Sequence, residues 1–216
     1  TVTITVPSKI KVACVGDSIT NGVGNSGGKS YPEQLGGLLG SHYEVKNFGH
    51  NGATVQDDGR DQNPEDSNSY GYRKTTTYKN SLSYAADIVI VMIGGNDSKD
   101  VNWKEGDNNF ERDYRALIQS YLDQPQHPLV LIGTACAVTE TKWTINDAVT
   151  SGEIAPLQRR IAAEMGLSLV DANALTSGHP EYSSDGVHLN DTGYGVVASA
   201  MQDGIKASLT GMNRFM

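Results

Sequence analysis

The chain has 216 residues, with 17 basic and 25 acidic side chains that give a formal net charge of −8 at pH 7. This length suggests one domain, which buries enough surface to fold without a metal or a disulfide framework. The acidic balance argues against binding to nucleic acid or anionic lipid, and no apolar run approaches the roughly 20 residues of a membrane span.

Short apolar runs predict the five strands of one parallel sheet. The run at 87–93 carries four consecutive β-branched residues, typical of a strand covered on both faces. The other four runs lie at 10–15, 43–48, 128–133 and 167–170. Between and after the strands, apolar residues recur at helical spacing at 31–39, 110–121, 154–165 and 191–209. This alternation predicts an open α/β sheet with right-handed crossovers.

Residues 1–9 precede the first predicted strand. The alternation from Val2 to Val6 favours a short strand, and no charged segment followed by an apolar one marks a leader. We expect residues 1–9 to be an N-terminal extension or the remnant of a linker. Residues 10–216 are expected to form a single domain.

A long irregular segment is predicted from Thr54 to about Thr77. Loops of this length in a compact domain are usually functional or mobile. The segment is rich in acids, and their spacing matches no calcium-binding loop, so we expect a solvated face; these acids are Asp57, Asp58, Asp61 and Asp66.

Two glycine-rich strings resemble nucleotide-binding motifs but lack their context. Residues 22–27 satisfy G-x-G-x-x-G, yet six residues separate them from the first strand, whereas a dinucleotide site needs a tight strand-to-helix turn. Residues 28–30 resemble the end of a phosphate loop, but Val23 stands where that motif needs glycine. We predict a flexible loop beside an active site and no nucleotide site.

Four separated segments carry the residue types that ester hydrolysis needs. Ser18 follows the first strand, Gly52 the second and Asn96 the third, while Asp185 and His188 precede the last helix. The carboxyl ends of parallel strands meet at one edge of a sheet, where open α/β proteins form their sites. There, a hydroxyl attacks, an imidazole moves its proton, a carboxylate orients the imidazole, and N–H donors hold the oxyanion.

These four segments, in this order, resemble the SGNH hydrolases, also called GDSL esterases. The family's Ser block matches Gly-Asp-Ser-Ile-Thr at residues 16–20, with Ile-Thr in place of the Leu-based string. Its Gly, its Asn and its Asp-x-x-His then fall on Gly52, Asn96, and Asp185 with His188. The blocks span residues 16–188, and no G-x-S-x-G elbow indicates an α/β-hydrolase instead.

The resemblance implies a three-layer, flavodoxin-like fold with five parallel strands in the order 2-1-3-4-5. It implies Ser18 as nucleophile, His188 as base and Asp185 as its orienting acid. The oxyanion hole would comprise Ser18, Gly52 and Asn96, with no metal and no cofactor. This strand order separates Cys14 from Cys136, both assigned to apolar strand segments, so we predict free thiols.

The stretch between Asp97 and Pro156 is similar to secreted bacterial acetylesterases that act on glycans. It therefore implies an oligosaccharide or small ester as substrate, and secretion or a periplasmic location. We expect Trp143 to bind substrate or simply to pack, and Trp103 to pack. A lysophospholipase or thioesterase for longer acyl chains is the alternative, and a glycan-binding module without activity is more distant. The sequence leaves the sugar and the oligomeric state open.

Overall fold

The computed structural model describes residues 8–61, 70–104 and 109–212. The strand expected at 2–6, nearly all of the expected N-terminal extension, and Asp66 lie outside the described residues. A five-stranded sheet with every pairing parallel forms the centre, in the order β2-β1-β3-β4-β5. The strands are β1 (Ile10–Gly16), β2 (Tyr43–Gly49), β3 (Ile88–Met92), β4 (Leu129–Gly133) and β5 (Ser168–Val170). The predicted fold and strand order are confirmed, with each strand end within one residue.

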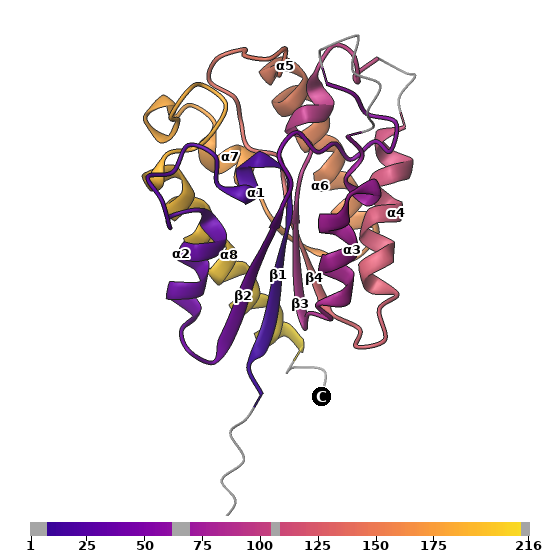
Figure 1. Ribbon diagram of the computed structural model, residues 1–216, viewed down its shortest axis with the longest axis vertical. Coiled ribbons are helices and arrows are strands. Elements are labelled where there is room, and N and C mark those ends of the chain that lie inside the picture. Colours follow the sequence, from indigo (N-terminus) through magenta and orange to yellow (C-terminus); the bar gives the residue numbers. More distant parts are fainter. Residues whose placement is uncertain (1–7, 62–69, 105–108, 213–216) are drawn as a thin grey trace, which may run out of the picture.

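Helices cover both faces of the sheet, so the molecule has three layers (Figure 1). One face carries α2 (Tyr31–Leu39) and the long C-terminal α8 (Asp191–Met212). The other carries α3 (Thr76–Ser83), α4 (Phe110–Leu122) and α6 (Ala155–Glu164). Among the described residues, none of these helices combines the length and the apolar character required to cross a bilayer.

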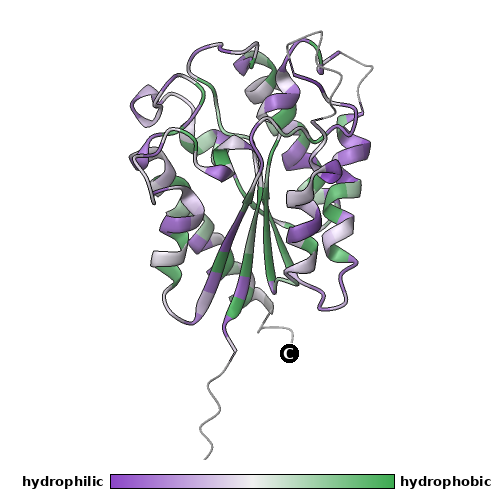
Figure 2. Ribbon diagram, viewed as in Figure 1, coloured by the Kyte–Doolittle hydropathy of each residue, from purple (hydrophilic) through white to green (hydrophobic). Residues whose placement is uncertain are grey.

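Successive side chains of a strand point to opposite faces of the sheet, so the core has two halves. Val12 and Cys14 of β1 pack under α2 and α8, whereas Ala13 and Val15 pack under α3, α4 and α6. Every residue of β3 is buried because both of its faces are covered. In Figure 2 the inner strands β3 and β4 are mostly apolar, whereas the edge strand β2 is partly polar, and polar residues are frequent on the helices.

The irregular segment ends earlier than predicted. Thr76 and Thr77 begin α3, whose N-cap is Thr75, with its hydroxyl accepting from the N–H of Tyr78. The sequence of α3 is mostly polar and presents few apolar residues to the sheet, so its periodicity is weak. Short turns complete the connections: α1 (Ser18–Asn21), η1 (Tyr72–Lys74), η2 (Gly95–Ser98), α5 (Asp147–Val149), η3 (Thr150–Ile154), α7 (Ala172–Thr176) and η4 (Pro180–Tyr182).

Both cysteines are free and buried, as predicted. Cys14 lies in β1, but Cys136 lies in the loop beyond β4 rather than within the strand. Burial raises the pKa of each thiol to about 12, which keeps both thiols protonated and unreactive.

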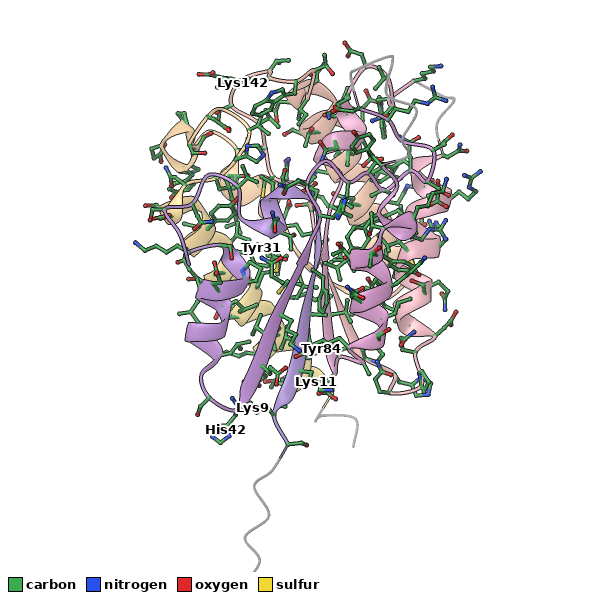
Figure 3. All side chains as sticks on the ribbon, in the orientation of Figure 1. Lys9, Lys11, Tyr31, His42, Tyr84 and Lys142 are labelled. Carbon is green, nitrogen blue, oxygen red and sulfur yellow. The ribbon has the colours of Figure 1, made fainter. Side chains whose placement is uncertain are left out.

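The strands give the molecule two distinct poles. One pole is formed by the amino ends of the strands. There β1 begins and α8 ends (Figure 1). Lys11 and His42 mark this pole in Figure 3, whereas Lys142 stands at the opposite one, above the strand carboxyl ends. All the predicted site residues belong to loops or short turns at or beyond the carboxyl ends of the strands.

Candidate active site

Ser18 is placed by the end of the central strand β1. The strand ends at Gly16, Asp17 acts as N-cap, and Ser18 is the first residue of α1. The Oδ1 atom of Asp17 accepts a hydrogen bond from the N–H of Ile19 at 2.9 Å. Burial raises the pKa of the Asp17 carboxyl, which lies beneath the turn. Asp17 therefore fixes the backbone that presents Ser18, as expected from its short side chain.

His188 connects Ser18 to Asp185. His188 Nε2 lies 3.0 Å from Ser18 Oγ, and His188 Nδ1 lies 2.8 Å from Asp185 Oδ2. The Oδ1 atom of Asp185 accepts from the backbone N–H groups of Val187 and His188 at 2.9 and 2.8 Å. The three-residue spacing of Asp-x-x-His thus closes a tight turn that holds the carboxylate under the imidazole.

The ionisation of Asp185 determines the tautomer of His188. Burial acts to raise the pKa of Asp185, but the hydrogen bonds from His188 and Val187 outweigh it and hold this pKa below its usual value. An ionised carboxylate only accepts, so Nδ1 of His188 must carry the proton. Nε2 is then free to accept the proton of the Ser18 hydroxyl, the arrangement that activates a serine.

Ser18, Gly52 and Asn96, the three predicted oxyanion donors, line one cleft. Gly52 adopts a left-handed backbone with φ of +76°, which favours glycine. One N–H of the Asn96 amide donates to Ala53 O at 3.1 Å, and the other remains for a ligand. Among residues 8–61, 70–104 and 109–212, the backbone N–H groups of Ser18 and Gly52 have no acceptor. These N–H groups are the kind of donor that an oxyanion requires, so the oxyanion hole stays a prediction.

Two spaces of different size share Ser18, Asn96 and Ile145 in their linings. A cleft of about 270 Å³ is lined by the predicted residues Ser18, Gly52, Asn96 and His188. Beyond Ser18 and Asn96 lies a recess of about 20 Å³, walled by the apolar cluster of Val138, Ile145 and Val187. The recess has room for about one small group, because a single water needs ~10–15 Å³.

Trp143 stands over the imidazole at the edge of the cleft. Its ring centroid is 5.5 Å from that of His188, and the residue remains 45% exposed. Trp143 and Thr144 form the two central residues of a tight turn, with φ of 51° and 57°. Trp103 instead packs on Phe110, and its indole N–H donates to Glu153. Trp143 is therefore available to a substrate, and Trp103 packs as expected.

The acidic segment is not the solvated face that we expected. Asp58 is exposed, but Asp57 is half-buried in an ion pair with Arg73. Asp61 pairs with Lys99, and both line the cleft. The partners of these acids are Arg73 of η1 and Lys99, which follows η2. Among the described residues, no three His, Cys, Asp or Glu side chains gather as a metal ion requires.

No sequence motif indicates the Lys99–Asp61 pair, because its members are 38 positions apart in polar loops. Asp97, which follows Asn96, has a structural role instead. Its carboxylate accepts from the backbone N–H groups of Val55 and Gln56 at 2.8 and 3.0 Å, and burial raises its pKa to about 7. Asp97 therefore holds the backbone at residues 55–56 to the η2 turn.

Comparisons with known sequences identify relatives of this chain. The model of the GDSL-like Lipase/Acylhydrolase family matches residues 14–196. An acetylxylan esterase of Xylanibacter ruminicola is 32% identical over 217 residues, covering 91% of this chain. The chain spans only 43% of the length of that relative.

Solved structures share the fold. A carbohydrate acetylesterase family member from Sinorhizobium meliloti superposes with a TM-score of 0.75 at 22% identity, over 93% of this chain and 99% of that one. The aryl esterase of M. smegmatis gives 0.71 at 18% identity, over 92% and 99%. The chain therefore belongs to the GDSL-like lipase and acylhydrolase family, the SGNH hydrolases.

Proposed function

We propose that the protein is a serine esterase that removes acetyl or other short acyl groups from carbohydrates. The observation that carries this proposal is the recess of about 20 Å³ beside Ser18 and Asn96. An acyl carbon bonded to Ser18, with its oxygen at the three N–H donors, would direct its substituent into this recess. The walls of Val138, Ile145 and Val187 suit a methyl group and leave no room for a long chain.

The proposed reaction has two steps with an acyl-enzyme between them. Ser18 Oγ attacks the ester carbonyl while its proton passes to His188 Nε2, and the protonated imidazole then gives that proton to the leaving alcohol. Water repeats the sequence on the acyl-enzyme, and the acid leaves as Ser18 is restored. Asp185 stabilises the imidazolium in both steps, and the N–H groups of Ser18, Gly52 and Asn96 hold the oxyanion.

The carbohydrate assignment is supported by the exposed face of Trp143 and by the relative named as an acetylxylan esterase. An indole face offers apolar contact to a pyranose ring. The leaving alcohol must lie on the side of His188, which donates its proton, and Trp143 stands on that side. The long-chain alternative requires an apolar channel, whereas the recess next to Ser18 is small.

The test is hydrolysis of p-nitrophenyl acetate, butyrate and octanoate by the wild type and by Ser18→Ala. We expect acetate to be the best of the three, and kcat for Ser18→Ala to fall by roughly 10³-fold or more, because the members of a triad act as a unit. Activity that rises steeply toward octanoate would favour the lysophospholipase or thioesterase. Equal activity in wild type and variant would disprove the role of Ser18.

A further inference from the structure

The cleft contains a second polar group that the proposed reaction leaves unused. We propose that Lys99 and Asp61 form a subsite for free hydroxyl groups on the sugar that carries the ester. This inference rests on the proposed function and adds to it the requirement for a partly unesterified sugar. Both residues line the same cleft as Ser18, Trp143 and His188.

Lys99 has unused donors in a nearly closed environment. Its side chain is 6% exposed, and its ammonium group lies 2.7 Å from Asp61 Oδ1. Among the described residues, Asp61 is the one side-chain acceptor for this ammonium, which carries three N–H donors. A buried donor without an acceptor is unfavourable, so the remaining N–H groups favour a ligand with oxygen acceptors.

The pair is held at a fixed place relative to the oxyanion hole. Lys99 directly follows the η2 turn that carries Asn96, and its N–H is bonded to Asn96 O. The buried amide of Asn102 donates to Asn96 O at 3.0 Å and to Arg60 O at 2.9 Å, while its oxygen accepts from the N–H of Arg60 at 2.7 Å. Asn102 therefore joins the backbone next to Asp61 to the backbone of Asn96.

Because of these contacts, the Lys99–Asp61 ion pair is not needed to hold residues 55–61 against the η2 turn. Asp97 already holds the N–H groups of Val55 and Gln56, and Asn102 holds Arg60. The segment is thus fixed to the η2 turn through its backbone. A charged pair that is not required to hold the loop, and that faces the cleft, is better explained by contact with substrate.

A sugar hydroxyl fits the pair because it both donates and accepts. Lys99 supplies donors, and Asp61 supplies acceptors on a side chain that is 37% exposed. A phosphate or carboxylate fits less well, since Asp61 and the net charge of −8 would repel it. The apolar recess takes the acyl group, so the polar pair faces the open cleft where the alcohol part of the ester must lie.

The experiment compares Lys99→Met and Asp61→Asn with the wild type on two sugar esters. One is a monoacetylated methyl β-xyloside, which has free hydroxyls, and the other is the same xyloside fully acetylated, which has none. Lys29→Met is the matched control, because Lys29 also pairs with an aspartate, Asp191, in a loop of the same rim, but does not line the cleft.

We expect each cleft variant to lower kcat/KM for the monoacetylated xyloside by about ten- to a hundredfold, as for hydrogen bonds to a charged group. The loss for the fully acetylated xyloside should be threefold or less, and Lys29→Met should leave both values within twofold. Equal losses on the two esters would overturn the inference, because the pair would then be structural. Unchanged kinetics would also overturn it.

A third result would assign the pair to the acyl side. If Lys99→Met mainly increases activity on p-nitrophenyl butyrate relative to acetate, the pair limits acyl length, and the inference is wrong. Failure of the proposed function has a separate signature. In that case the wild type itself does not hydrolyse the monoacetylated xyloside, or Ser18→Ala matches the wild type on p-nitrophenyl acetate.

Discussion

At the scale of single residues, the side chains that carry out the reaction differ from those expected to determine substrate specificity. Ser18, His188 and Asp185 form one hydrogen-bonded series, with 3.0 and 2.8 Å between successive partners. The residues expected to select the substrate surround this series without being bonded to it. Ile145 is the clearest example, because its side chain borders both the cleft and the recess.

Replacing Ile145 with alanine should widen the recess and relax acyl selection. We expect the ratio of kcat/KM for p-nitrophenyl butyrate to that for acetate to rise roughly tenfold, the effect of about one methylene in an apolar pocket. Ile161→Ala is the control, since Ile161 belongs to α6, is buried in the core and does not line the recess. The recess would not bind the acyl group if both variants kept the wild-type ratio.

At the scale of elements, the turn that carries Trp143 is strained. Its hydrogen bond runs from Ile145 N–H to Lys142 O at 2.9 Å, and both central residues have positive φ, as a type I′ turn requires. Such turns favour Asn-Gly, whereas here a β-branched Thr144 occupies the second position, and its buried hydroxyl has no partner among the described residues. The turn keeps the Trp143 ring against His188.

Replacing Thr144 with glycine should therefore stabilise the protein. We expect the free energy of unfolding to rise by about 1 kcal/mol, because glycine adopts positive φ without the cost that a side chain adds. Thr144→Ala is the control, since it removes the unpartnered hydroxyl but keeps the Cβ. Denaturant titration measures both variants, and an equal gain would assign the effect to the hydroxyl instead of the backbone.

The sequence predicted elements where packing leaves a periodic pattern. Strands buried on both faces, such as β3, and amphipathic helices, such as α4, were recognised within a residue or two. The whole helix α3 is absent from the prediction because its mostly polar residues carry little periodicity, and η3 and α5 are too short to show any.

The same contrast holds for the site. The four motif blocks predicted which residues meet at Ser18, because each block is local and follows a strand or precedes a helix. The Lys99–Asp61 pair depends on how two loops fold against each other, which no local pattern encodes. The recess has the same origin, since its walls come from segments far apart in the chain.

At the scale of the whole molecule, burial of Asp97 couples folding to pH. Burial raises its pKa to about 7 from about 3.9 in an unfolded chain. Between these two pKa values, folded Asp97 keeps a proton that the unfolded chain releases. The contribution of Asp97 to the free energy of unfolding is therefore greatest below the unfolded pKa and is lost as pH rises toward the folded pKa. Acids with lowered pKa, such as Asp185, act oppositely and lose their contribution as pH falls below about 4.

We therefore expect the free energy of unfolding to be highest near pH 4–5 and to fall toward pH 7, by at most about 4 kcal/mol for three pKa units. Chemical denaturation at a series of pH values measures this dependence. Asp97→Asn removes the titrating group and should flatten the decline. A decline of the same steepness in this variant would show that another group causes it.

The two poles of the sheet have a practical consequence. The described chain starts and ends at the pole of the strand amino ends, and the cleft opens at the other. A support or a fused partner attached next to the first or last described residue would therefore lie on the far side of the molecule from the cleft. The immobilised protein should admit a large substrate as readily as the free one, since the length of the strands separates the attachment point from the cleft.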